Sequence, residues 1–215
     1  MASILRAGVC AMDAAGDFPA AELLPAEAVA LGAAVEGRRR EFALGRSLAR
    51  KALAELGYAA EPILRGAHRE PQWPSGIVGS ITHCAQYCAA AVAPATLLLA
   101  VGIDAERHRA IPDGVVRKIA RDEELQWMRQ RTDESIRWDC VTFSAKESVF
   151  KAWFSLAHRW LGFDDVSLTF DPPAGTFVAH LTIEPLVAEG RVIADFRGRF
   201  LVSDERVLTS VTVDA

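Results

Sequence analysis

Two carboxylates follow directly after a strongly apolar run in this 215-residue chain. Seven consecutive apolar or glycine residues, 97–103, lead into Asp104, and Glu106 follows two places later. Side chains two apart on a strand point to the same face, roughly 7 Å from each other. At an effective dielectric near 20 their repulsion is on the order of 2 kcal/mol. A strand that ends in solvent tolerates this repulsion, so the pair alone is weak evidence for a site.

A third carboxylate lies in an aromatic pattern further along the chain. The segment TFSAKESVFKAWF is predicted to be helical, and one of its faces carries Glu147 among Phe143, Phe150 and Phe154. An unpaired carboxylate among aromatic rings is costly. A surface ion pair with Lys151, one turn on, is worth about 0.3–0.5 kcal/mol. Such a pair does not require three phenylalanines, and a bound cation explains the placement better.

These acids together predict a metal site of hard oxygen ligands. Asp104, Glu106 and Glu147 suit Mg²⁺, with Mn²⁺ as an alternative, and water and phosphate oxygens would complete the coordination. Lys146 and Lys151 lie beside Glu147 in the sequence, which favours a polyanionic ligand over a bare metal cage.

Positive charge is concentrated in one segment, although the formal net charge of the chain is −4. The segment GRRREFALGRSLARK, residues 37–51, places Arg38 and Arg46 about two helical turns apart, so that they face a similar direction. Guanidinium groups match phosphate oxygens well. Arg65, in a proline-rich loop, and His83, at a strand end, are further candidate donors. Taken alone, each arginine is explained by an ordinary solvated charge, and His83 is more often a satisfied core histidine than a ligand.

The elements that must position these residues alternate between helical and strand patterns. A strand, a helical region, two strand-like runs, two helical regions and four strands follow one another over residues 3–12, 25–56, 76–93, 96–104, 113–131, 135–157, 166–170, 177–184, 194–203 and 206–213. This order predicts an α+β fold with two similar α/β halves, 1–106 and 107–215.

Composition excludes several other classes of protein. The four cysteines include no C-x-x-C pair, which indicates reduced thiols. No uncharged apolar window of about 18 residues and no leader with a basic flank occurs, so we expect a cytoplasmic protein without a membrane span. The acidic balance gives no reason to expect binding to nucleic acid or to a membrane.

Three quoted segments resemble the successive motifs of one enzyme family. REPQWPSGIVGSITHC, VGIDAE and FSAKESVFKAWF occur in this order. They are similar to motifs of the 4′-phosphopantetheinyl transferases, in particular the larger surfactin-synthetase and enterobactin types and their actinobacterial members. The resemblance runs from about residue 36 to about residue 165 and includes RWLGF at 159–163. It implies two α/β halves related by a pseudo-twofold, with coenzyme A in the cleft between them and Mg²⁺ at its diphosphate.

The resemblance also implies roles for individual residues. It assigns the metal to Asp104, Glu106 and Glu147. It assigns contacts with the coenzyme to Arg38, Arg46, Arg65, Thr82, His83, Lys146, Lys151, Phe150 and Trp160, of which the last two would line the pantetheine arm. The arginine run leaves Arg38 and Arg39 as alternatives. His68 departs from the family pattern, because related members often carry a lysine there.

The implied reaction transfers the 4′-phosphopantetheine arm to a serine hydroxyl of an apo carrier protein and releases adenosine 3′,5′-bisphosphate. Glu147 or a metal-bound water would act as the general base, Asp104 would hold the metal, and Lys151 would stabilise charge on the departing phosphate. The carrier could belong to fatty acid, polyketide, nonribosomal peptide or siderophore biosynthesis. A monomer would suffice, because both halves lie in one chain.

The carrier is expected to dock on basic residues, and other functions compete with the transfer. Arg117, Lys118, Arg121 and Arg129 are predicted on the first helix of the second half, where a solvated helix face explains them equally well. A Mg²⁺-dependent phosphohydrolase or nuclease would also use three acids and several arginines. A non-catalytic module that binds an acidic partner through the basic helix is the other alternative.

Overall fold

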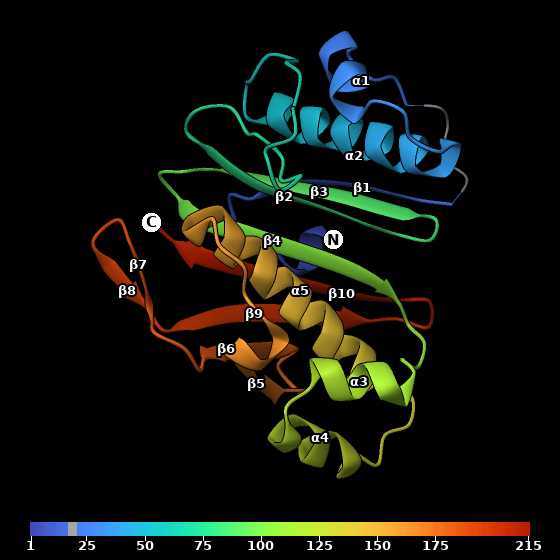
Figure 1. Cartoon of the computed structure of the whole chain (residues 1–215), viewed down its shortest axis with the longest axis vertical. Helices are drawn as coiled ribbons and strands as arrows, with labels where there is room; N and C mark the ends of the chain where they lie inside the picture. Colours follow the sequence, from blue (N-terminus) through green and yellow to red (C-terminus); the bar gives the residue numbers. More distant parts are fainter. Residues whose placement is uncertain (17–20) are drawn as a thin grey trace.

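Two antiparallel sheets form the centre of the computed structural model, which describes residues 1–16 and 21–215. The smaller sheet has the order β1-β3-β2; α2 covers its outer face, and α1 lies beyond α2 (Figure 1). These elements are β1 (Cys10–Ala15), α1 (Pro25–Leu31), α2 (Glu36–Glu55), β2 (Ile77–Cys84) and β3 (Tyr87–Pro94). A short 3₁₀ helix, η1 (Ala2–Ile4), precedes them.

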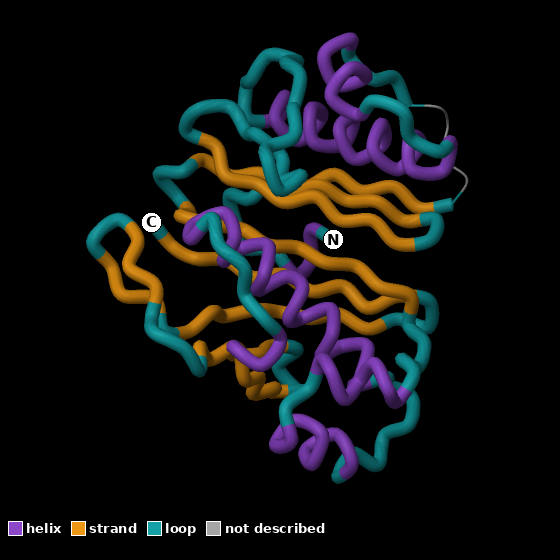
Figure 2. The backbone as a smooth tube through the Cα atoms, viewed as in Figure 1, coloured by secondary structure: helices purple, strands orange, loops and turns teal. Residues whose placement is uncertain are grey.

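The larger sheet has the order β4-β10-β9-β6-β5, and the long helix α5 crosses one of its faces (Figures 1 and 2). Its strands are β4 (Leu98–Arg107), β5 (Val166–Asp171), β6 (Thr176–Leu181), β9 (Asp195–Val202) and β10 (Arg206–Asp214). The helices of this half are α3 (Asp113–Ile119), α4 (Asp122–Arg129) and α5 (Trp138–Ala157), followed by a 3₁₀ turn, η2 (Phe163–Asp165). The α+β class predicted from the sequence is confirmed.

Several predicted elements differ in their limits. The helical region expected over 25–56 is two helices, because Gly32 ends α1 at a φ of 65°. The region expected over 113–131 is also two helices, because Ala120 is extended. A two-stranded ribbon, β7 (Leu186–Ala188) and β8 (Arg191–Ile193), was not predicted. Three-residue strands are too short for a clear alternation of polar and apolar residues.

The strand that carries the two acids belongs to the second sheet. β4 pairs antiparallel with β10 from Leu98 to Arg107, whereas β3 pairs with β1 and β2. By sheet membership the chain changes halves between β3 and β4, earlier than the expected boundary after Glu106. The sequence did not show this, since the partner of β4 is the last strand of the chain.

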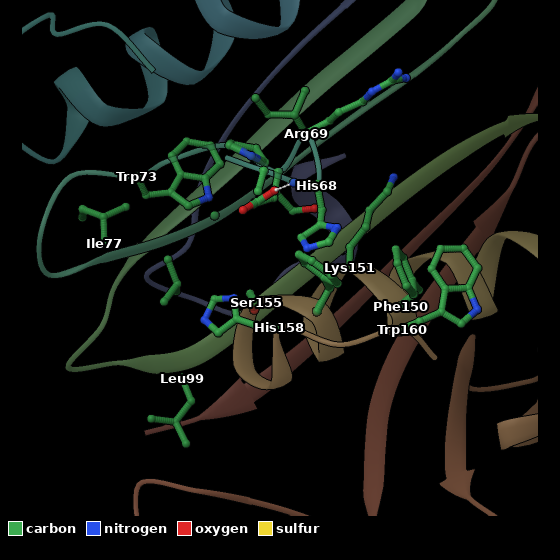
Figure 3. A pocket seen from close by; sticks show the side chains of 18 residues that line it. His68, Arg69, Trp73, Ile77, Leu99, Phe150, Lys151, Ser155, His158 and Trp160 are labelled. Carbon is green, nitrogen blue, oxygen red and sulfur yellow. Dashed lines mark hydrogen bonds between the residues drawn. The ribbon is translucent and has the colours of Figure 1, made fainter. Parts of the chain in front are cut away.

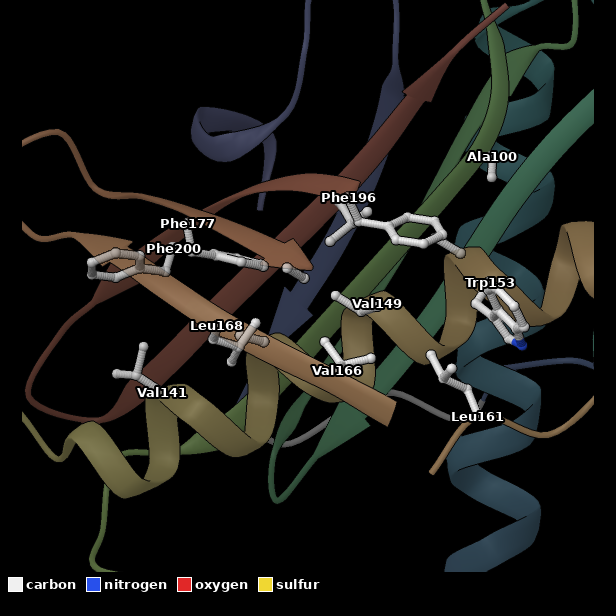
Figure 4. Close-up of a cluster of buried hydrophobic side chains, with 14 of the residues drawn as sticks. Ala100, Val141, Val149, Trp153, Leu161, Val166, Leu168, Phe177, Phe196 and Phe200 are labelled. Atoms are coloured by element: carbon white, nitrogen blue, oxygen red, sulfur yellow. The ribbon is translucent and has the colours of Figure 1, made fainter. Parts of the chain in front are cut away.

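The apolar core of each half lies between its sheet and its long helix. In the larger half, Val141, Val149 and Trp153 of α5 pack against Phe177 and Phe196 of the sheet (Figure 4). In the smaller half the equivalent layer is α2 on β3, whose residues 88–93 are mostly alanine and fully buried. The small side chains there let α2 approach one face of β3 and β4 (Leu98–Arg107) approach the other.

Side chains, rather than a backbone ladder, connect the two sheets where β2 runs beside β4. The backbone N–H of Ile103 donates to Ser80 Oγ at 3.1 Å, and that of Ala105 donates to Thr82 Oγ1 at 3.1 Å. Both hydroxyls are buried. Each therefore satisfies a backbone donor that would otherwise lack an acceptor in the interior.

All four cysteines are free. Within residues 1–16 and 21–215, every helix is too short or too polar to cross a membrane.

Candidate active site

Close packing of α5 on β4 brings the predicted acids to one place. A Cβ atom added at Gly102 would lie 1.9 Å from the carbonyl oxygen of Ser148 and 2.9 Å from the backbone nitrogen of Ala152. Only glycine allows this approach of helix and strand backbones. The glycine of the VGID segment therefore sets the distance between the acids of β4 and Glu147 of the helix.

Asp104 is the most firmly held of the three acids. Its side chain is 6% exposed and accepts hydrogen bonds from Thr82 Oγ1 at 3.1 Å and from Ser144 Oγ at 2.8 Å. Lys151 Nζ also donates to Asp104 Oδ1 and to the carbonyl oxygen of Ile103, both at 2.8 Å. These donors come from β2 and α5, so both halves of the molecule orient this carboxylate.

The pKa values of Glu106 and Glu147 are both raised in the cluster. Burial raises the pKa of Glu106 to about 7, and the charge of Asp104 adds to this, while Lys151 opposes it. Burial and Asp104 also raise the pKa of Glu147, again against Lys151. The three carboxylates therefore lie within electrostatic range of one another, with the single ammonium group of Lys151 among them.

The donor chemistry of this cluster fits a hard divalent cation. The described part of the chain contains no group of three or more acid, thiol or imidazole side chains arranged to hold a metal ion. Mg²⁺ does not need one, because it usually takes one or two carboxylates and completes its shell with waters and substrate phosphates. A cation would also relieve the repulsion that raises the pKa values of Glu106 and Glu147.

An arginine cluster lies on the smaller half, and its member Arg69 lines the larger cavity described below. The pKa of Arg65 is lowered by burial and by the charges of Arg38 and Arg69, so these guanidinium groups lie close together. Arg38 Nη1 donates to Nε2 of His83 at 2.8 Å, and burial lowers the pKa of that histidine. A neutral His83 accepting at Nε2 carries its proton on Nδ1. Like charges held together in this way indicate an anion site.

Two residues expected to contact the coenzyme have their polar groups engaged within the protein. Arg46 is 4% exposed, its Nε donates to the carbonyl oxygen of Ile63 at 2.7 Å, and burial lowers its pKa to about 10. It holds the loop that carries Arg65. Thr82 is 3% exposed and its hydroxyl joins Asp104 to the backbone of Ala105. Thr82 therefore positions Asp104, and its contact with the coenzyme stays a prediction.

Lys146 lines the smaller of the two cavities described below, but its ammonium group is engaged within the protein. Its ammonium group lies 2.8 Å from Glu124 Oε2, and both side chains are 2% exposed. Nζ also donates at 2.9–3.0 Å to three backbone carbonyl oxygens, those of Ile119, Phe163 and Val166. With this many acceptors around it, Lys146 fastens α5 to the surrounding loops. On a helix, residues five apart point about 140° away from each other, so Lys151 faces the cleft while Lys146 faces the interior.

Two cavities meet at the cleft-facing side of α5. The larger, about 650 Å³, lies between this helix and the loop of residues 67–73 (Figure 3). Trp73, Ile77 and His158 line one end of it, and Phe150, Lys151 and Trp160 line the other. The smaller, about 210 Å³, is lined by Glu147, Phe150, Trp160 and residues 161–163. Phe150 and Trp160 border both cavities, with their ring centroids 4.9 Å apart.

The sequence analysis did not predict the buried residues that hold Asp104 in place. Ser144 is fully buried and its hydroxyl donates to Asp104, while its backbone carbonyl oxygen accepts from the hydroxyl of Thr209 on β10 at 2.8 Å. Its position three residues before Glu147 on the helix is the only sequence signal, and small polar residues at that spacing are common. His68 contacts Phe154 across the cleft, with ring centroids 5.4 Å apart.

The basic residues proposed for docking are divided between two helices. Arg117 and Lys118 lie at the end of α3, whereas Arg129 ends α4. Arg121 precedes α4 and its guanidinium bonds Glu123 and the carbonyl oxygen of Asp164. The predicted single basic helix face is therefore wrong in its geometry, and Arg121 is the member most engaged by its neighbours.

Related sequences are known that match most of the chain. Residues 26–93 match the family model of the 4′-phosphopantetheinyl transferase N-terminal domain, and residues 100–201 match that of the 4′-phosphopantetheinyl transferase superfamily. The chain is 42% identical over 205 residues to the 4′-phosphopantetheinyl transferase Svp of Streptomyces mobaraensis, covering 94% of this chain and 82% of that protein. It is 40% identical over 201 residues to the 4′-phosphopantetheinyl transferase PptT of Mycobacterium tuberculosis, covering 92% and 88% respectively. It is also 36% identical over 168 residues to enterobactin synthase component D of Salmonella typhi, covering 74% and 64%.

Proposed function

Since the chain belongs to the 4′-phosphopantetheinyl transferase superfamily, we propose that its cleft binds coenzyme A across the junction of the two cavities. The enzyme transfers the 4′-phosphopantetheine arm of coenzyme A to a carrier protein. The acceptor is a serine hydroxyl of the apo carrier, and the second product is adenosine 3′,5′-bisphosphate.

The two cavities and the charged groups between them suggest how the coenzyme lies. The nucleotide occupies the larger cavity, near the arginine cluster of Arg38, Arg65 and Arg69. The pantetheine arm enters the smaller cavity beside Phe150 and Trp160. The diphosphate then lies at Lys151, between the acid cluster and the arginines, where opposite charges face each other across the cleft.

Asp104, Glu106 and Glu147 would hold Mg²⁺, which would supply positive charge to neutralise the diphosphate. Mn²⁺ would be accepted by the same oxygen donors. The chain's own contribution is to fix these carboxylates: Thr82 and Ser144 orient Asp104, and the contact at Gly102 fixes the position of Glu147.

The serine oxygen attacks the phosphorus on the pantetheine side of the diphosphate. A phosphorus–oxygen bond forms to serine, and the bond to the bridging oxygen breaks, so that the bisphosphate leaves with the electron pair. Glu147 accepts the serine proton as the general base. Lys151 stabilises the charge that develops on the leaving phosphate.

The remaining assignments follow from the shape and charge of the surface. Carrier proteins that are acidic around their serine would meet Arg117 and Lys118, which are exposed on α3. The enzyme acts as a monomer, because the cleft lies between two halves of one chain, and it works in the cytoplasm, where coenzyme A and carrier proteins occur together. Neither nucleic acid nor a membrane takes part.

One observation carries this proposal: Lys151, which pairs with Asp104 of the acid cluster, lines the larger cavity together with Arg69 of the arginine cluster. Incubation of the enzyme with an apo carrier, coenzyme A and Mg²⁺ tests it. Intact-protein mass should show that the carrier gains one phosphopantetheine group, and an excess of chelator should stop this. Continued transfer in the presence of chelator would reject the metal.

Glu147→Gln tests the assignment of the base. The amide keeps the size of the side chain but cannot accept the proton, so transfer should fall by at least roughly a hundredfold, while coenzyme A still binds in a calorimetric titration. A variant that keeps full activity would remove Glu147 from the mechanism.

A further inference from the structure

The backbone of Ile63 is held on both sides by charged side chains that come from two helices. Its N–H donates to Glu27 Oε1 at 3.0 Å, and its carbonyl oxygen accepts from Arg46 Nε at 2.7 Å. Glu27 lies on α1 and is fully buried, as is Ile63, which is 1% exposed. Arg50 of α2 donates to both oxygens of Glu27 at 2.5 and 2.6 Å and so neutralises the buried carboxylate.

Ile63 is the base of a small hairpin that forms one wall of the coenzyme cleft. The N–H of Gln72 donates to the carbonyl oxygen of Leu64 at 3.0 Å, and that of Gly66 donates to the carbonyl oxygen of Glu70 at 2.8 Å. The side chain of Glu70 folds back over the turn and accepts from the N–H of His68. The hairpin of residues 64–72 is therefore internally ordered, and its orientation depends on how its base is held.

The hairpin carries cationic and aromatic-contacting residues into the cleft. His68 and Arg69 line the larger cavity (Figure 3), and His68 also contacts Phe154 of the opposite half. The guanidinium group of Arg65 lies 5.4 Å from the ring centroid of Phe42, on whose ring Arg46 also packs at 4.4 Å. A shift at Ile63 would move these groups together, away from the phosphates.

We infer that Glu27 is a positioning residue for coenzyme A: through Ile63 it sets the orientation of the hairpin and hence of Arg65. It touches neither the coenzyme nor the acid cluster. The inference rests on the proposed function, because it requires that the hairpin contacts the coenzyme. It predicts an effect on the KM for coenzyme A, with little effect on kcat or on the KM for the carrier.

Two double variants test the role of the hydrogen bond without leaving a buried charge unpaired. E27Q/R50M and E27M/R50M both lack the ion pair, and replacing both partners of a buried pair is often tolerated. Only the glutamine retains an acceptor oxygen for the N–H of Ile63. The methionine variant should raise the KM for coenzyme A roughly tenfold, while the glutamine variant stays within about twofold of the wild type. Equal KM values in the two variants would overturn the inference.

Arg65→Ala separates failure of the inference from failure of the proposed function. Alone, it should raise the KM for coenzyme A, and an unchanged KM would reject the phosphate contact and with it the coenzyme assignment of this wall. Added to E27M/R50M, it should cause a much smaller further rise, because the guanidinium has already been displaced. Fully additive effects would show that Glu27 does not act through the hairpin.

Glu27→Asp covers the case in which E27M/R50M does not fold. It keeps the charge that Arg50 requires and shortens the reach to Ile63 by one methylene. The KM for coenzyme A should rise severalfold, while Glu36→Gln, at an exposed glutamate of α2, leaves it unchanged. If Glu27→Asp alters the melting temperature but leaves the KM for coenzyme A unchanged, then Glu27 only stabilises the fold and the inference is wrong.

Discussion

Replacement of Gly102 by alanine should impair the acid cluster without touching any of its members. The added Cβ would lie 1.9 Å from the carbonyl oxygen of Ser148, whereas such contacts are essentially never shorter than 3.0 Å. The backbone of α5 would therefore have to move away from β4 by about 1.1 Å or more. No side-chain rotation can relieve the clash, because the opposing atom belongs to the backbone.

The displacement predicts two measurable effects. Overpacking of a tight interior contact costs about 1–3 kcal/mol, which lowers the melting temperature of a chain of this size by about 2–12 °C. A shift of roughly 1 Å at the reacting groups lowers the rate of the chemical step on the order of a hundredfold. We therefore expect a large fall in kcat with a smaller change in the KM for coenzyme A, because the arginine cluster lies on the other half.

Steady-state transfer to an apo carrier and thermal unfolding would be measured on the same preparation. Gly114→Ala is the matched control, because a Cβ atom there meets nothing within 4 Å and the residue lies on α3. That variant should keep its melting temperature or raise it slightly. Wild-type kcat and wild-type stability in Gly102→Ala would refute the argument that this contact sets the distance from β4 to Glu147.

Three further substitutions test the remaining assignments. Lys146→Met should lower the free energy of unfolding by about 3–5 kcal/mol, because it leaves Glu124 buried without its partner. The KM for coenzyme A should stay unchanged, and a raised KM at unchanged stability would support the predicted coenzyme contact. Thr82→Val should cost about 1–3 kcal/mol in chemical denaturation, because it leaves the N–H of Ala105 unsatisfied, and should lower kcat more than it raises KM. Trp160→Ala removes a side chain that is 76% exposed, so the melting temperature should not change while the KM for coenzyme A rises; an unaffected KM would exclude Trp160 from the arm's site.

Much of the site was predictable because its residue types and local spacings already limit the chemistry. An acid two places after another on a strand lies on the same face, and Glu147 lies on the same helix face as Phe150 and Phe154. In the structure the charge of Asp104 raises the pKa values of both Glu106 and Glu147, so the three acids lie within electrostatic range of one another. The α+β class followed equally from the order of helical and strand patterns.

What a charged side chain does once it is folded was not contained in those spacings. Lys146 and Lys151 look alike in the sequence, but only the packing of α5 on the sheet turns one toward Glu124 and the other toward Asp104. Arg46 was expected to bind phosphate, and instead its guanidinium holds a loop backbone 17 residues away. Burial and partners depend on contacts between residues far apart in the chain, which local patterns do not encode.

The sequence by itself therefore determined which groups are available: three carboxylates, a set of arginines, and the periods that place them on given faces of strands and helices. The tertiary structure alone decided their separations and surroundings. Gly102 permits the close contact of α5 and β4, the last strand of the chain pairs with the acid-bearing strand, and Glu27 holds the base of a distant hairpin. Each of these depends on steric fit or desolvation between segments that meet only after the chain has folded, and this is why no local pattern could have predicted them.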